Sequence, residues 1–170
     1  DISDASRLDA ELSREAPQAV ALSRLLSTIV EIYQMTDTAH AVGFALQDSL
    51  PANATVRGRD ERLGQVFRNL IDNAVSFSPA GGTVTVTASK HDICARVTVE
   101  DEGPGIPPDN LESIFERFYT ERPGENFGRN SGLGLSIARQ IIEGAGGRIY
   151  AENRDSGGAR LIVELPLAQF

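Results

Sequence analysis

Asp101-Glu-Gly-Pro-Gly-Ile106 is the first of two glycine clusters on which the expected fold of this chain depends, and Ser131-Gly-Leu-Gly-Leu-Ser136 is the second. Each cluster alone also fits an ordinary turn or helix cap, because glycine adopts backbone conformations that other residues avoid. A helix candidate that carries Asn69 and Asn73 precedes both clusters. In this order, the helix and the two clusters predict a single nucleotide-binding site.

Composition bounds the class of protein. The 170 residues are 41% hydrophobic and 24% charged, which is typical of one soluble globular domain with a single core. The net charge of −8, with no run of lysine or arginine, argues against a nucleic-acid partner, since duplex binding needs a basic face. The single Cys94 cannot form an internal disulfide, and no stretch approaches ~18 consecutive apolar residues. We therefore expect a cytoplasmic location.

Hydrophobic periodicity predicts the elements. The expected helices span residues 19–35, 60–77 and 131–144, with a short helical stretch at 111–119 and a terminal helix that ends before Pro17. The expected strands span residues 42–46, 55–57, 83–90, 93–101, 148–153 and 159–165. We expect His91-Asp92 to form the turn of the central hairpin.

Three amides recur along one face of the 60–77 helix, at Gln65, Asn69 and Asn73. Asparagine is a poor helix former, so two asparagines one turn apart in mid-helix suggest that a ligand offsets the cost. Amide oxygens at this spacing suit Mg²⁺, which commonly shares its ligands with phosphates. The alternative is a solvated polar face.

The second strand of the hairpin ends on a carboxylate where a hydrophobic residue is expected. Two-residue periodicity places Asp101 on the same face as the apolar residues Ile93, Ala95, Val97 and Val99. A half-buried carboxylate needs a donor, and the exocyclic amine of a purine is one that fits. Gly103 and Gly105 leave room for a flat ring or a backbone turn. The alternative role for Asp101 is to cap the turn that follows it.

The second cluster opens a helix. Ser131 offers an N-cap, and Gly132 and Gly134 leave the N–H groups of the first turn open to phosphates. The spacing fits neither the G-x-G-x-x-G motif nor a P-loop, so we exclude the Rossmann and P-loop folds. Residues 107–130 join the two clusters, and a connection of this length is either a functional lid or disordered. We favour the lid.

The whole ordered set resembles the N, G1, F and G2 boxes of sensor histidine kinases. The matching stretches are Asn69-Leu-Ile-Asp-Asn73-Ala74, Asp101-Glu-Gly103-Pro-Gly105, Phe115-Glu-Arg-Phe118-Tyr119 and Gly132-Leu-Gly134-Leu135. The resemblance covers about residues 19–166. Residues 62–69 and 115–122 are most similar to the ChvG/ExoS-type kinases of alphaproteobacteria.

This resemblance implies an α/β (α+β) two-layer sandwich, the Bergerat fold of the kinase, gyrase and Hsp90 group, in which a mixed, mainly antiparallel sheet packs on helices. It implies that Asn73 and Asn69 hold Mg²⁺ and that Asp101 receives the adenine amine of ATP. The other residues that it implies in ATP binding are Gly103, Gly105, Ile106, Phe118, Ser131, Gly132, Leu133, Gly134 and Leu135. Slow hydrolysis is also implied, because Asn69 stands where the ATPases of this group carry a glutamate base.

The chain departs from the family pattern at two positions. Ser76 and Thr120 stand where the family often has a lysine and an arginine. We therefore expect Arg122 to act as a catalytic residue on the phosphates, with Arg117 and Arg129 as the other candidates.

The phosphoacceptor motif of the family is absent, since neither His40 nor His91 has the required neighbours. Residues 1–16 resemble the end of the helical dimerisation domain that carries this histidine in the family. We therefore divide the chain into this stub and a catalytic ATP-binding domain at residues 17–170.

The expected function is that of a protein-histidine kinase domain that binds Mg·ATP and donates the γ-phosphate to a histidine on the separate dimerisation domain. A response regulator is the expected downstream partner. The chain itself is expected to be a monomer that does not autophosphorylate, in the cytoplasmic portion of an inner-membrane kinase. The alternatives are a nucleotide-binding regulatory module without transfer and a serine kinase of the anti-sigma-factor type.

Overall fold

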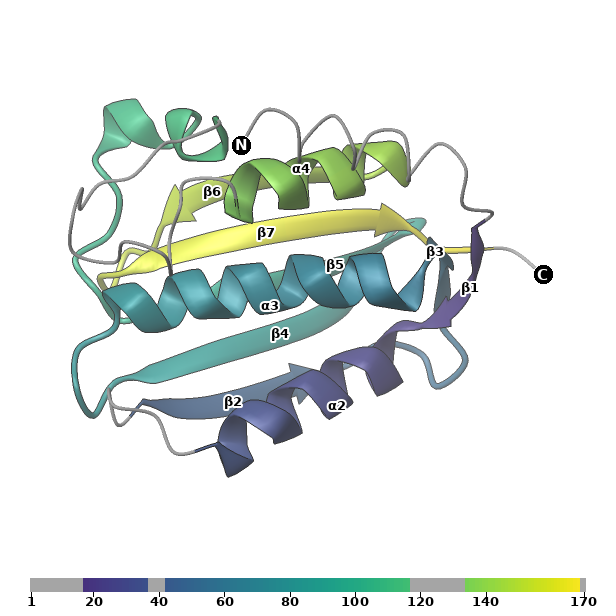
Figure 1. The fold of residues 1–170 in the computed structure, drawn as a ribbon, viewed down its shortest axis with the longest axis horizontal. Helices are drawn as coiled ribbons and strands as arrows, with labels where there is room; N and C mark the ends of the chain where they lie inside the picture. Colours follow the sequence, from purple (N-terminus) through teal and green to yellow (C-terminus); the bar gives the residue numbers. More distant parts are fainter. Residues whose placement is uncertain (1–16, 37–41, 117–133, 169–170) are drawn as a thin grey trace.

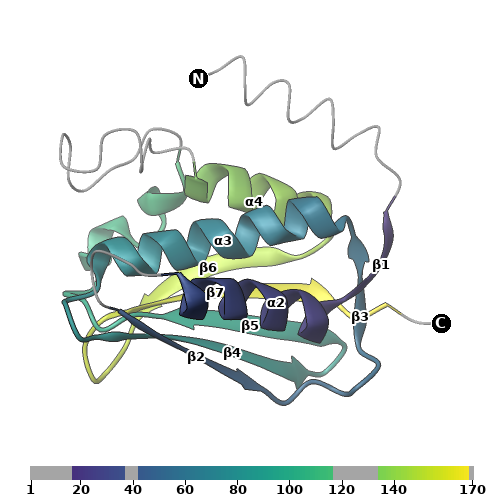
Figure 2. The same ribbon diagram turned by 60° about the horizontal axis from the view of Figure 1, so that its bottom comes forward.

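The structure is a computed structural model that describes residues 17–36, 42–116 and 134–168. In these ranges a five-stranded sheet forms one layer and helices that cover one of its faces form the other (Figures 1 and 2). The helices are α2 (Leu22–Met35), α3 (Asp60–Phe77) and α4 (Gly134–Gly144). The strands of the sheet are β2 (Gly43–Asp48), β4 (Thr83–His91), β5 (Cys94–Glu100), β6 (Arg148–Asn153) and β7 (Ala159–Pro166).

The sheet has the order β2-β4-β5-β7-β6. All neighbouring strands are antiparallel except β2 and β4, which run parallel. The mixed, mainly antiparallel sheet packed on helices that the sequence predicts is therefore confirmed. β7 lies between β5 and β6, so the last described strand occupies the interior of the sheet.

The core forms between the helices and the sheet because each element presents one apolar face. Val84, Val86 and Ala88 of β4 face the helices, as do Ala95, Val97 and Val99 of β5, and all six are at most 1% exposed. The buried residues of α3 recur at helical spacing and include Leu63, Val66, Phe67, Leu70, Ile71 and Ala74. α3 therefore lies over the centre of the sheet with its amide-bearing line at the border of the core.

The start of the first described helix was predicted wrongly. Residues Gln18–Ala21 form strand β1, which pairs with β3 (Thr55–Gly58) in a separate two-stranded sheet, and α2 begins only at Leu22. Val20 pairs with Val56, and both are buried. A pairing between residues this far apart in sequence overrides the local helical pattern.

The hairpin turn also differs from the prediction by one residue. His91 pairs with Cys94, so the two-residue turn is Asp92-Ile93. Asp92 has a φ of 54°, which aspartate tolerates and which a tight hairpin turn requires. Ile93 is 69% exposed and does not belong to the buried row.

One short 3₁₀ helix replaces the described part of the helical stretch predicted at 111–119, and another precedes it. They are η1 (Pro108–Asn110) and η2 (Ser113–Phe115), and residues 117–119 lie outside the described ranges. Their hydrogen bonds run to the third preceding residue, for example from Glu116 N–H to Ser113 O. Ile114 and Phe115 are buried and anchor this segment in the core.

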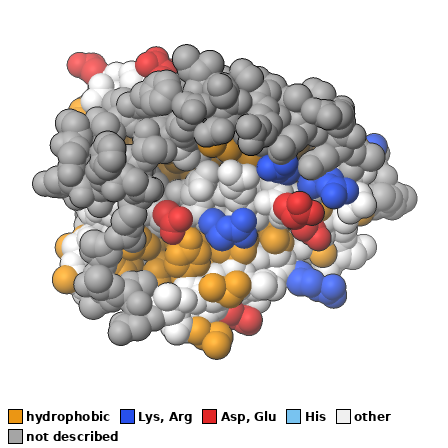
Figure 3. All heavy atoms as spheres, viewed as in Figure 1, with side chains coloured by type: hydrophobic (Ala, Val, Ile, Leu, Met, Phe, Trp, Pro, Cys, Tyr) orange, Lys and Arg blue, Asp and Glu red, His pale blue; other side chains and the backbone are white. Residues whose placement is uncertain are grey.

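The helical face of the molecule is mixed in character. Acidic and basic side chains alternate there with apolar ones, and the apolar ones gather at the lower left (Figure 3). Ile32 and Met35 in the last turns of α2 are 57% and 85% exposed. No helix within the described ranges is both long and apolar enough to cross a membrane.

Candidate functional site

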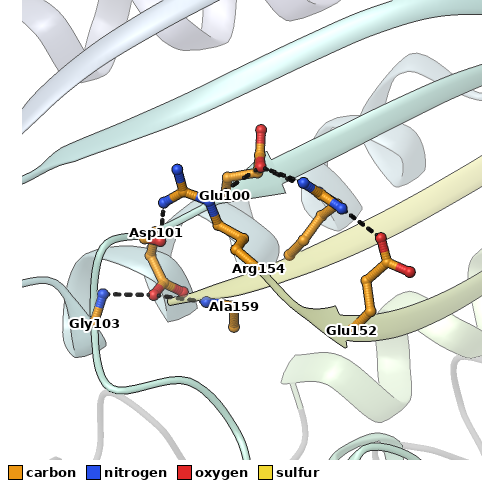
Figure 4. Close-up of polar contacts among 7 residues, drawn as sticks. Glu100, Asp101, Gly103, Glu152, Arg154 and Ala159 are labelled. Carbon is orange, nitrogen blue, oxygen red and sulfur yellow. Dashed lines mark hydrogen bonds and ion pairs between the residues drawn. The ribbon is translucent and has the colours of Figure 1, made fainter. Parts of the chain in front are cut away.

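Asp101 follows β5 and points into the core, as two-residue periodicity predicted. It is only 4% exposed. The backbone N–H groups of Gly103 and Ala159 donate to its Oδ1 at 2.9 and 3.3 Å (Figure 4). Among the described residues both hydrogen bonds of this carboxylate end at Oδ1, so Oδ2 keeps its capacity to accept.

Burial raises the pKa of the Asp101 carboxyl above its ordinary value. The two backbone N–H groups and the nearby Arg154 guanidinium act in the opposite direction, since each favours the charged form. Asp101 is therefore a buried acid held in place by the backbone rather than by a paired cation.

The first glycine cluster bends tightly against the end of α3. A Cβ atom on Gly103 would lie 2.3 Å from the carbonyl oxygen of Phe77, a separation that no side chain can occupy. Gly105 has a φ of +85°, which glycine adopts without strain. Of the two interpretations of these glycines, a close backbone approach is the one observed at Gly103.

Two open depressions adjoin this cluster. One has a volume of about 370 Å³ and is lined by Ser76, Phe77, Ser78, Pro79, Glu102, Gly103 and Pro104. The other has a volume of about 600 Å³ and is lined by Phe77, Pro104, Gly105, Ile106, Pro107, Pro108 and Asn153. Phe77 and Pro104 border both, so the end of α3 and the first cluster form a shared wall.

The asparagine helix meets the second cluster directly. The Nδ2 of Asn69 donates to the carbonyl oxygen of Gly134 at 3.0 Å, and α3 and α4 lie side by side (Figure 1). A Cβ atom on Gly134 would lie 3.7 Å from the Asn69 amide carbon, which is ordinary contact. Leu135 packs on the core from the first turn of α4. The two motifs that lie 65 residues apart in sequence are thus neighbours.

The amides of α3 fit a hard cation. Asn69 donates through its nitrogen to Gly134, and the oxygen of the same amide has the lone pairs that a metal ligand needs. The side-chain amide of the half-buried Asn73 makes no hydrogen bond with any described residue. In the described ranges no group of three or more His, Cys, Asp or Glu side chains is arranged to hold a metal ion. The metal site that the sequence predicts at Asn69 and Asn73 stays a prediction.

Comparison with known protein families identifies the arrangement. Residues 58–169 match the family model described as "Histidine kinase-, DNA gyrase B-, and HSP90-like ATPase". The chain belongs to this family. The Bergerat fold expected from its motifs is therefore confirmed.

The relatives of this ATPase-family domain are sensor kinases. The chain is 46% identical to "Sensor protein ChvG" of Rhizobium meliloti (strain 1021) over 178 residues, which cover 98% of this chain and 31% of the relative. The chain thus spans about three tenths of the length of the curated relatives that it matches first. The predicted similarity to ChvG-type kinases is confirmed.

Solved structures agree with this classification. Full-length ShkA in complex with AMPPNP matches with a TM-score of 0.77 and 29% identity, covering 96% of this chain and 34% of that chain. Histidine kinase ThkA in complex with the response regulator TrrA matches with a TM-score of 0.74 and 28% identity, covering 98% of this chain and 49% of that one. The chain is therefore an ATP-binding catalytic domain of the sensor histidine kinase type.

Several predicted site residues of this kinase-type domain lie outside the described residues, namely Phe118, Arg122, Ser131, Gly132 and Leu133. The same holds for Arg117, Thr120, Arg129 and His40, and for the stub at residues 1–16. His91 is described and lies exposed at the end of β4.

Sequence reasoning missed two polar residues that the kinase-type domain places against the first cluster. The Nδ2 of Asn153 donates to the carbonyl oxygen of Ile106 at 2.8 Å, and the N–H of Ile106 donates to Asn153 Oδ1 at 2.7 Å. The Nη1 of Arg154 donates to the carbonyl oxygen of Asp101 at 2.8 Å (Figure 4). The available signal was a polar pair at the end of a strand, just before the turn that contains Gly157 and Gly158.

Proposed function

We propose that this domain binds Mg·ATP and donates its γ-phosphate to a histidine on a separate dimerisation domain of the same kinase. The observation that carries the proposal is Asp101, a buried carboxylate with both described hydrogen bonds on one oxygen. The second oxygen is the acceptor that an adenine amine requires. Ile106 and Phe77 border the adjoining depression with apolar surface, which suits the faces of a purine ring.

The phosphate end of the proposed site is the junction of α3 and α4. Asn69 and Asn73 would hold Mg²⁺ through their amide oxygens, and the start of α4 at Gly134 and Leu135 would receive phosphate oxygens at the positive end of the helix dipole. The bound metal supplies positive charge that lowers the repulsion between the phosphates. Positioning of the γ-phosphate, with Arg122 neutralising its charge, supplies most of the catalysis in this proposal.

The partners follow from the same proposal. The phosphoacceptor histidine lies on a dimerisation domain whose second helix ends in residues 1–16, and a response regulator takes the phosphoryl group from it. The ThkA structure bound to the response regulator TrrA supports a partner of this class. We further propose that the domain works in the cytoplasmic portion of a membrane sensor kinase and that the chain alone is a monomer.

A titration with a fluorescent ATP analogue in Mg²⁺ tests the binding half of the proposal. Asp101→Asn turns an acceptor into a donor opposite the adenine amine, and Asn73→Asp adds negative charge beside the phosphates. We expect each variant to bind about tenfold more weakly or worse. Asn53→Asp, an exposed turn residue, is the matched control and should bind like the wild type. If neither site variant changes the titration curve, the site is assigned wrongly.

A second experiment tests transfer. The domain is mixed with labelled ATP and the dimerisation domain of a ChvG-type kinase, and the label on that domain is then treated with acid and with base. Phosphohistidine is acid-labile and base-stable, whereas phosphoserine behaves in the opposite way. Base-stable label supports the proposal, acid-stable label supports the serine kinase, and binding without label supports a regulatory module.

A further inference from the structure

Two consecutive residues hold both ends of the first glycine cluster: Asn153, the last residue of β6, and Arg154, which follows it. Asn153 forms a pair of hydrogen bonds with the backbone N–H and carbonyl of Ile106, at 2.7 and 2.8 Å. Arg154 donates to the carbonyl oxygen of Asp101 at 2.8 Å. The cluster starts at Asp101 and ends at Ile106, so both ends are attached to the chain where β6 ends.

The turn between β6 and β7 lies against the backbone of Asp101. A Cβ atom on Gly158 would lie only 2.0 Å from the Asp101 carbonyl oxygen, so this contact admits glycine alone. Gly158 has a φ of +93°. The carbonyl oxygen of Ala159, the next residue, accepts from the Asp101 N–H, and the Ala159 N–H donates to the Asp101 carboxylate. The end of the β6–β7 turn is therefore in close backbone contact with the start of the cluster.

The segment held in this way has little structure of its own. Residues 101–107 form no helix or strand, and Gly103 and Gly105 widen the range of conformations that the free segment can adopt. Ordering each backbone residue costs conformational entropy, so a segment of this kind needs external hydrogen bonds to keep one conformation. Asn153 and Arg154 supply such bonds from outside the segment.

Arg154 is itself held by acidic residues. Its Nε lies 3.2 Å from Glu100 Oε2, and the same oxygen lies 3.0 Å from Arg160 Nη2 (Figure 4). The guanidinium is thus fixed between the side chain of Glu100 and the backbone of Asp101. Glu100 keeps a cationic partner if Arg154 is replaced, so a variant at this position does not leave a carboxylate unpaired.

We propose that Asn153 and Arg154 are positioning residues for the base of the nucleotide. By holding the backbone of Ile106 and Asp101, they keep the Ile106 side chain and the Asp101 carboxylate at the distance and angle that adenine requires. This inference rests on the proposed function. Neither residue needs to touch ATP. Their effect passes through the backbone of Ile106 and Asp101.

Competition by ATP and by GTP against a fluorescent ATP analogue tests this role in the full chain. Asn153→Ala removes two hydrogen bonds to Ile106, and we expect the affinity for ATP to fall about three- to tenfold. The affinity for GTP should fall less, because GTP does not use the contact between Asp101 and an adenine amine. Arg154→Ala should act in the same direction, and Arg154→Lys should restore part of the preference for ATP. Asp155→Ala, an exposed position in the β6–β7 turn, is the matched control.

Hydrogen exchange of the Ile106 amide gives a second readout without nucleotide. It should be faster in Asn153→Ala than in Asp155→Ala, while the unfolding midpoints of the two variants stay equal. The inference is overturned if Asn153→Ala and Arg154→Ala keep the wild-type ratio of ATP to GTP affinity, or if both affinities fall in parallel with stability. A wild-type chain that binds no adenine nucleotide would instead overturn the proposed function, and the inference with it.

Discussion

Around Asp101, a strand end, a glycine cluster and a distant turn are joined by hydrogen bonds, whereas the side-chain amide of Asn73 makes none with another described residue. At the first place the backbone is closed so tightly that Gly103 and Gly158 admit no side chain. At the second, a single hydrogen bond joins Asn69 to Gly134 across ordinary contact distances. The base end of the proposed site is thus built by the protein itself, whereas the phosphate end offers groups that the ligand and its metal would complete.

This difference separates two kinds of variant. Changes of the closely packed glycines at the base end should cost stability and binding together, because the backbone there has no room for a side chain. Changes at the phosphate end should cost binding alone, because the amides of α3 carry little of the fold. Measuring both the free energy of unfolding and the nucleotide affinity of each variant tests whether the two ends differ in this way.

The largest effect is expected for Gly103→Ala. The added methyl group would collide with the Phe77 carbonyl oxygen at 2.3 Å, and forcing an extra group into a closed contact costs about 1–3 kcal/mol of stability. Because the backbone next to Asp101 must shift, nucleotide affinity should fall about tenfold or more as well. Urea unfolding and nucleotide titration measure the two effects.

Gly144→Ala is the matched control for that variant. Nothing lies within 4 Å of a Cβ atom at Gly144, at the end of α4, so this change should be neutral or slightly stabilising. If Gly103→Ala and Gly144→Ala lose equal stability and equal nucleotide affinity, the base end does not depend on the close approach at Gly103.

Removal of magnesium should act on the phosphate end only. Chelation with EDTA should weaken ATP binding about tenfold and leave the urea midpoint of the nucleotide-free protein unchanged. Asn73→Ala should abolish this metal dependence without loss of stability, since alanine is the better helix former. Asn53→Ala should keep the metal dependence of the wild type. If the ATP affinity of Asn73→Ala still depends on magnesium, Asn73 is not a ligand of the proposed metal site.

The smallest effect expected is a pH dependence of stability at the base end. Burial raises the pKa of Asp101, so the folded chain binds this proton more tightly than the unfolded chain. Stability should therefore fall as the pH rises from the ordinary carboxyl value, about 3.9, through the raised value, and then stay level. Asp101→Asn removes this loss and should be slightly more stable than the wild type at neutral pH while it binds ATP more weakly.

The difference between wild type and Asp101→Asn, measured by urea unfolding from acidic to neutral pH, isolates this one group from the other carboxylates. A wild type that gains stability over the variant through this window would mean that the backbone N–H groups outweigh burial at Asp101.

Sequence reasoning predicted those parts of the fold and site that depend on regular spacing. Asp101 was placed in the core from the alternation of β5, and Asn69 was placed on a shared face with Asn73 from the period of α3. Both periods are local properties of the chain, so one sequence is enough to find them.

The features that were missed depend on contacts between distant residues. β1 forms because Val20 pairs with Val56, and the sequence of residues 18–21 does not indicate this partner. Asn153, at the end of β6, contacts Ile106 across 47 positions, in a loop that has no regular spacing. Such contacts follow from the strand order of the whole sheet, which a local pattern does not contain.

The place of β7 in the sheet bears on how the protein is made. β7 is the last described strand of the chain, yet it lies between β5 and β6, and its first residue, Ala159, supplies backbone hydrogen bonds to Asp101. A ribosome releases Asn69, Asp101 and Gly134 well before it releases β7. The nascent chain therefore exposes every motif of the site before the base end can assemble. A polypeptide that ends before Ala159 would contain all the motifs, but its base end would lack the hydrogen bonds that Ala159 makes with Asp101.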